Sequence, residues 1–183
     1  MILAYGKNVD VRSIVYSALC LALCVVLPFL TGGNVALGTK FTPMHYPVLL
    51  CGFIAGPFWG AVVGGVAPFL RFILTGAPAI YPLAIRMAAE LLVYGLAAGL
   101  FYRYLPKKPF GIYVSLLCAQ FFGRLAWGAA QFLLSLFDKT LPFYFEIIIA
   151  QTVTPSLVGI LIQILLIPPI VIAMQKARLI ARH

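Results

Sequence analysis

Residues 82–104 read PLAIRMAAELLVYGLAAGLFYRY, an apolar run that carries only Arg86, Glu90 and Arg103 as charges. At about 1.5 Å of rise per residue, a helix over this run is long enough to cross the roughly 30 Å hydrocarbon core of a bilayer. The sequence PKKP at residues 106–109 follows directly, interrupts the helix and adds two lysines. Residues 82–104 are therefore predicted to form a transmembrane helix.

Similar apolar runs lie on both sides of this segment, and together they predict six spans, at residues 11–30, 43–55, 58–74, 82–104, 111–137 and 143–174. The second span is short and is joined to the third at Gly56-Pro57, so the two are expected to form a hairpin. The last span is longer than the bilayer, and we expect Pro155 or the pair Pro168-Pro169 to kink it or to end its membrane-embedded part. Residues 31–41 are predicted to form a polar loop.

The composition supports a membrane protein. The chain has 183 residues, of which 63% are hydrophobic and 9% are charged, and its mean hydropathy is +1.07. Water-soluble domains typically carry about 25% charged residues. We therefore expect a single membrane-embedded domain over residues 1–183, with no room for an ATPase of its own. The four cysteines lie in apolar stretches without a CxxC pair, so they are interpreted as small buried hydrophobic residues.

The basic residues predict the orientation, because cytoplasmic loops are enriched in Lys and Arg. With the N-terminus inside, the outer loops receive only Lys40 and Lys139. The cytoplasmic side then receives eight basic residues: Lys7, Arg12, Arg103, Lys107, Lys108, Lys176, Arg178 and Arg182. The prediction is an all-α bundle of six transmembrane helices in the cell membrane, with both termini cytoplasmic. The net charge of +9 follows from this orientation and does not indicate nucleic-acid binding.

Five charged residues remain inside the predicted spans: Arg71, Arg86, Glu90, Arg124 and Glu146. Each costs roughly 2.5 to 3.5 kcal/mol on insertion, so each needs a partner or a function. Arg86 and Glu90 are four residues apart and can pair on one helix face, which Tyr94 extends by another turn. That face is interpreted either as a self-neutralising pair or as one wall of a binding cavity near the outer surface. Arg71 is expected to extend its side chain to the outer interface.

A second polar face lies on the fifth predicted span, where Gln120, Arg124 and Gln131 are separated by four and seven residues. It is either an interhelical hydrogen-bond network or a second wall of the same cavity. If Glu90 neutralises Arg86, Arg124 remains free for a carboxylate, a phosphate or a carbonyl group, which favours a neutral or anionic ligand. The outer half of the sixth span is also polar, with Glu146, Gln151, Thr152 and Thr154.

Other residues give weaker signals. His45 is either an interface histidine or a ligand contact, and Lys40 and Asn34 on the adjacent loop are candidates for part of a lid. With only His45 and His183 as histidines, no cluster of metal ligands is expected. The sequence also has no nucleophile beside a base, no carboxylate dyad and no phosphate-binding glycine loop, so neither an enzyme nor a bound cofactor is predicted. Ala18 and Ala22 form an A-x-x-x-A face that packs within the bundle or against a partner helix.

The stretch KFTPMHYPVLLCGFIAGPFWGAVVGG at residues 40–65 contains the pattern P-x-L-L-x-G-x-x-x-G-P leading into a Gly-rich helix. In this pattern, and in its size and number of spans, the chain resembles the substrate-binding S components of energy-coupling factor (ECF) vitamin transporters. The resemblance implies high-affinity binding of a vitamin or related micronutrient in a bacterial plasma membrane. It also implies ATP-driven uptake with a transmembrane coupling subunit and two cytosolic ATPases.

The resemblance further implies that Ala18 and Ala22 dock to the coupling subunit. It places the binding cavity near the outer face, and the candidate substrate-binding residues are Asn34, Lys40, His45, Arg86, Glu90, Tyr94, Gln120, Arg124 and Gln131. Two alternatives stay open. One is a self-sufficient secondary transporter in which Glu90 or Glu146 is a proton or ion site. The other is a structural membrane subunit whose polar residues only hold the bundle together.

Overall fold

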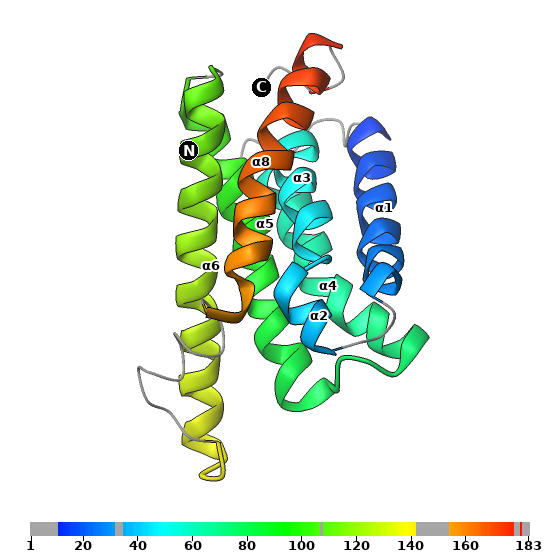
Figure 1. The fold of residues 1–183 in the computed structure, drawn as a ribbon, viewed down its shortest axis with the longest axis vertical. Helices are drawn as coiled ribbons and strands as arrows, with labels where there is room; N and C mark the ends of the chain where they lie inside the picture. The colour runs from blue at the N-terminus through cyan, green and yellow to red at the C-terminus, as the bar shows by residue number, and fades with distance from the viewer. Residues whose placement is uncertain (1–10, 32–34, 107, 142–153, 178–179, 181–183) are drawn as a thin grey trace.

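The computed structural model describes residues 11–31, 35–106, 108–141, 154–177 and 180. In these ranges every regular element is a helix, without a strand, and the helices pack side by side (Figure 1). The α6 helix lies at one edge of the bundle and α1 at the opposite edge. The elements are α1 (Val11–Val26), η1 (Leu27–Thr31), α2 (Val35–Phe41), α3 (His45–Ala55), α4 (Pro57–Thr75), η2 (Ile80–Ala84), α5 (Ile85–Tyr104), α6 (Pro109–Phe137) and α8 (Thr154–Lys176).

All six predicted spans contain one of the longer helices, so the all-helical prediction is confirmed. Within the described ranges, five segments are long and apolar enough to cross a membrane: Val11–Leu30, Pro57–Thr75, Ile80–Tyr104, Pro109–Phe137 and Ser156–Lys176. The remaining helix, α3, has 11 residues. It covers only about half of the hydrocarbon thickness.

One detail differs from the sequence-based expectations. The segment predicted as a polar loop at residues 31–41 contains the helix α2, whose seven residues include four hydrophobic ones. The α8 helix has Pro155 in its first turn, where a missing N–H is tolerated, and it continues through Pro168 and Pro169 to Lys176. The kink, or the end of the membrane-embedded part, that these prolines predict stays a prediction. Residues 143–153 of the sixth predicted span lie outside the described ranges.

The α5 helix packs against α3, α4 and α6 and is the centre of the bundle. Glycines make the closest of these contacts possible. A Cβ atom added at Gly60 would lie 2.6 Å from the Gly95 carbonyl oxygen, and one at Gly52 would overlap the same atom. Small residues at such positions allow the backbones of membrane helices to approach closely. The predicted hairpin between α3 and α4 is confirmed, with a single connecting residue, Gly56, at φ 93°.

The first residues of α1 and α6 and the last residues of α5 and α8 lie at one end of the bundle (Figure 1). The basic residues on these four helix ends are Arg12, Lys108, Arg103 and Lys176. Their gathering at a single end agrees with the charge distribution that the orientation prediction used. The opposite end contains α2, η2 and the end of α6, and we call it the loop end.

Candidate functional site

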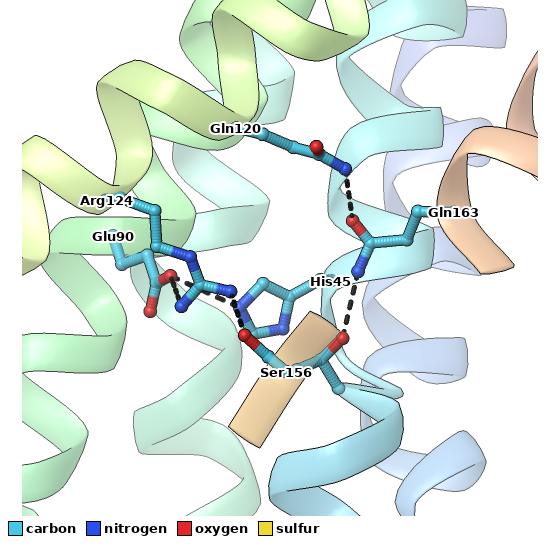
Figure 2. A network of polar contacts seen from close by, with 7 residues as sticks. His45, Glu90, Gln120, Arg124, Ser156 and Gln163 are labelled. Atoms are coloured by element: carbon cyan, nitrogen blue, oxygen red, sulfur yellow. Dashed lines mark hydrogen bonds and ion pairs between the residues drawn. The ribbon is translucent and has the colours of Figure 1, made fainter. Parts of the chain in front are cut away.

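The centre of the candidate site is a buried ion pair between α5 and α6. The Nη1 atom of Arg124 lies 2.7 Å from Oε1 of Glu90, and the two side chains are 15% and 4% exposed. Nε2 of His45, the first residue of α3, lies 3.6 Å from the same carboxylate oxygen. Arg124 also donates from Nη2 to the hydroxyl of Ser156 on α8, at 2.7 Å. Figure 2 shows these side chains pointing toward one another from four helices.

This geometry corrects the expected pairing on α5. Glu90 neutralises Arg124 on the neighbouring helix and not Arg86 on its own helix. Arg86 instead donates from Nη1 to Oε1 of Gln131, at 2.6 Å. The packing of α6 against α5 places the Arg124 guanidinium against Glu90, while Gln131 and the ring of Trp127 hold the Arg86 guanidinium elsewhere. Arg124 is therefore not the free cation that the sequence suggested.

A chain of hydrogen bonds continues the cluster toward α8. Gln120 on α6 donates to Oε1 of Gln163 at 3.0 Å, and Gln163 donates in turn to the hydroxyl of Thr42 at 2.9 Å. All three side chains are buried. Thr42 lies between α2 and α3 and has a positive φ of 47°. The expected interhelical network around Gln120 is thus present, and it ties the connection before α3 to α8 (Figure 2).

Sequence reasoning missed three members of this cluster, namely Thr42, Ser156 and Gln163. A signal for two of them exists in the sequence. Ser156 and Gln163 are seven residues apart in an otherwise apolar helix, which places them on one face two turns apart. The same spacing led to the prediction for Gln131 and Arg124. For Thr42 no such periodicity exists, because it lies in the short connection between two helices.

Next to the ion pair, several buried polar atoms have no hydrogen-bond partner. They include Nδ1 of His45 and Nε of Arg124, whereas Nε2 of His45 and the hydroxyl of Tyr94 both face the carboxylate of Glu90. The two rings meet edge to face with centroids 5.2 Å apart, and Tyr94 is fully buried. Gly123 on α6 makes room for this tyrosine, since a Cβ there would lie 2.9 Å from the ring. Buried polar groups are nearly always satisfied, so this concentration of unsatisfied atoms indicates a functional site.

A second arginine centre lies one helical turn from Glu90 toward the loop end. Arg86 is 9% exposed, its guanidinium carbon lies 5.0 Å from the centroid of the Trp127 ring, and its Nε has no hydrogen-bond partner. It forms no ion pair with any carboxylate among the described residues. The candidate site thus has two parts, a neutral pair at Glu90 and Arg124 and an uncompensated cation at Arg86.

Comparison with protein families gives a match over most of the chain. The family model for the substrate-specific component of ECF transporters matches residues 12–172. The chain belongs to this family. It is therefore an S component, a multi-pass membrane protein that binds the substrate of an ECF transporter and is not an enzyme, as the sequence predicted. Comparisons with curated proteins and with solved structures found no match.

Of the other predicted residues of this S component, the described Lys40 and Arg71 do not join the cluster. Lys40, on α2, is exposed. Asn34, Glu146, Gln151 and Thr152 lie outside the described ranges. Arg71 is half-buried, and its Nη1 lies 3.6 Å from the sulfur of Met44.

The loop end of the S component is held together outside the span by Asp138, which follows α6. Its Oδ1 accepts hydrogen bonds from the hydroxyl and the N–H of Thr140, at 2.6 and 3.0 Å, and its Oδ2 accepts one from the hydroxyl of Tyr81, at 3.0 Å. These bonds stabilise the ionised form, with those from Thr140 contributing most, and they lower the pKa of Asp138. Asp138 is thereby engaged by η2 and by its own turn.

The A-x-x-x-A face of α1 points away from the bundle. Ala18 and Ala22 are exposed, whereas Ser17, Cys20 and Cys24 on the same helix are buried. The interpretation that this face packs within the bundle is therefore wrong. The exposed large side chains beside it are Val11, Ile14, Val15, Leu19 and Val26. Three of the four cysteines are buried, as predicted, and Cys118 is partly exposed.

Proposed function

We propose that this S component binds a vitamin or related micronutrient with high affinity at the His45, Tyr94, Glu90 and Arg124 cluster. The ligand is then taken up with energy from ATP by an ECF module made of a transmembrane coupling subunit and two cytosolic ATPases. The observation that carries the proposal is the buried polar cluster in the middle of an apolar bundle, where His45, Tyr94 and Arg124 converge on Glu90 and Nδ1 of His45 has no hydrogen-bond partner.

The electrostatics of the cluster support a rigid, neutral recognition surface. Glu90 and Arg124 compensate each other, and Ser156 fixes the second arm of the guanidinium. A ligand that hydrogen-bonds to His45 and Tyr94 meets groups that are already desolvated and held in place, so little ordering remains to oppose binding. The neighbouring cation at Arg86 favours a neutral or anionic ligand over a cationic one.

Docking to the coupling subunit is proposed for the exposed face of α1. Ala18 and Ala22 present small side chains to the outside, so a partner helix can approach the backbone closely there. The bundle interior does not use this face. The adjacent exposed apolar side chains on α1 provide the surrounding contact area for a helix of a membrane-embedded partner.

The test of the binding site is a pair of matched tyrosine variants. The bound small molecule is first identified by native mass spectrometry of the gently purified protein, and its affinity is then measured for Tyr94→Phe and for Tyr102→Phe. Both tyrosines are buried on α5, but the hydroxyl of Tyr102 accepts a hydrogen bond from Gln175 at 2.6 Å, near the basic end. Loss of one ligand hydrogen bond is worth about 0.5 to 1.5 kcal/mol, which corresponds to as much as about tenfold in affinity.

We expect Tyr94→Phe to weaken binding by several-fold up to tenfold and Tyr102→Phe to leave it unchanged. A folded Tyr94→Phe protein with wild-type affinity would show that the ligand does not use this hydroxyl. An equal loss in both variants would point to a general effect on the bundle and would contradict a local site.

A further inference from the structure

Arg86 differs from Arg124, the other arginine between α5 and α6, in having no counter-charge among the described residues. Arg124 has the carboxylate of Glu90 at 2.7 Å and the hydroxyl of Ser156 at 2.7 Å. Arg86 has one neutral hydrogen-bond acceptor, Oε1 of Gln131, at 2.6 Å. An unpaired charge is expensive in a bilayer-spanning helix, so an uncompensated arginine at this depth indicates a function.

The carboxylates in the described part of the chain are already engaged elsewhere. Glu90 is paired with Arg124, and Asp138 accepts hydrogen bonds from Thr140 and Tyr81. Neither forms an ion pair with Arg86. The compensation for Arg86 therefore has to come from a group that the described residues do not supply.

The surroundings of Arg86 hold its guanidinium in one orientation. The group lies over the ring of Trp127, 5.0 Å from the centroid, and Gln131 fixes one of its arms. The Nε donor is buried and unsatisfied. A planar guanidinium with free donors and a fixed plane matches the geometry of a carboxylate or phosphate, which accepts two parallel hydrogen bonds.

We propose that Arg86, supported by Trp127 and Gln131, is a subsite for a carboxylate or phosphate group of the transported molecule. This inference rests on the proposed function, because the anion belongs to the ligand bound at the neighbouring cluster. Arg86 and Glu90 are one helical turn apart, about 6 Å along the helix axis. A vitamin-sized molecule spans that distance, so its uncharged part contacts His45 and Tyr94 while its acidic group lies at Arg86. The transported molecule is then an anion at neutral pH.

The test uses Trp127 as the reporter. The chain contains two tryptophans, so Trp59→Phe leaves Trp127 as the only one. The full-length variant in lipid nanodiscs is titrated with sodium phosphate and, separately, with sodium acetate, at an ionic strength kept constant with sodium chloride. We expect a saturable change in Trp127 emission with at least one anion. The phosphate and acetate arms distinguish a phosphate group from a carboxylate group.

Four further variants in the same background show whether the response comes from Arg86. Arg86→Gln should weaken the apparent anion affinity at least tenfold, and Arg86→Lys should retain part of it. Arg103→Gln, which removes an exposed charge at the other end of α5, should leave it unchanged. The absence of a saturable response to both anions would overturn the proposal, as would an undiminished response in Arg86→Gln. A response that appears only after Glu146→Gln would also overturn it, because a carboxylate of the chain itself would then occupy the site.

These experiments distinguish failure of the Arg86 subsite from failure of the proposed micronutrient binding. If mass spectrometry finds a bound micronutrient without an acidic group, or if Trp127 does not respond to either anion, the subsite is wrong and micronutrient binding stands. If Trp127 responds but no micronutrient binds or is taken up, the anion site stands and the proposed function is wrong.

Discussion

Replacing Glu90 by glutamine removes the negative charge of the buried ion pair and keeps the shape of the side chain. In the structure the carboxylate is 4% exposed and lies 2.7 Å from Nη1 of Arg124. Unit charges about 4 Å apart interact by about 4 kcal/mol at an effective dielectric constant of about 20. Removing one partner of a buried pair typically costs about 3 to 5 kcal/mol, because the other charge is left uncompensated. We expect Glu90→Gln to lower the free energy of unfolding by about 3 kcal/mol.

The assay is unfolding by SDS in mixed micelles, with Arg103→Gln as the control, which should stay within about 0.5 kcal/mol of the wild type. The double variant Glu90→Gln with Arg124→Met completes a thermodynamic cycle. The double variant leaves no unpaired charge, so its loss of stability should be clearly smaller than the sum of the losses in the single variants Glu90→Gln and Arg124→Met. A Glu90→Gln protein within about 0.5 kcal/mol of the wild type, or strictly additive effects in the double variant, would refute this reasoning.

Three further predictions use other parts of the structure. Gly95→Ala places a Cβ against the backbone of α4 and should destabilise the bundle by about 1 to 3 kcal/mol. The control Gly65→Ala, where the nearest atom is a leucine methyl at 3.4 Å, should be close to neutral. Equal stabilities of the two variants in SDS unfolding would contradict the close contact between α4 and α5. Gln163→Leu leaves two buried partners unsatisfied and should cost about 1 to 3 kcal/mol in the same assay, and no change would show that the network does not stabilise the fold. Ala18→Trp with Ala22→Trp should abolish co-purification with the coupling subunit and uptake while ligand affinity stays intact, and survival of both would place the interface elsewhere.

The helices were predictable because their signals are local. Runs of apolar residues bounded by Pro, Gly and charges predict spans, and α4, α5 and α6 lie within a few residues of the predicted ranges. The α2 helix was missed because it has only seven residues. A segment this short does not show the repeating hydrophobic pattern by which a helix is recognised in a sequence. The proline pair in α8 predicts a kink or the end of the membrane-embedded part by local rules, and the helix itself continues through it.

The composition of the site was also predictable, but its pairing was not. Polar residues in apolar spans are conspicuous, and the structure brings His45, Glu90, Tyr94 and Arg124 together. Which arginine neutralises Glu90 depends on the rotation of α6 against α5, and sequence spacing along one helix carries no information about that rotation. Whether Ala18 and Ala22 face the bundle depends likewise on how α1 is turned, and the structure shows them exposed.

The most direct test of the account is uptake in proteoliposomes, using the molecule identified by mass spectrometry. The proposed function assigns substrate binding to the S component and the energy of ATP hydrolysis to its partner subunits. We predict that the S component alone binds the molecule but accumulates none, and that ATP-dependent uptake appears when the coupling subunit and the two ATPases are included. Uphill uptake driven by a proton or sodium gradient with this chain alone would contradict the account and establish a secondary transporter.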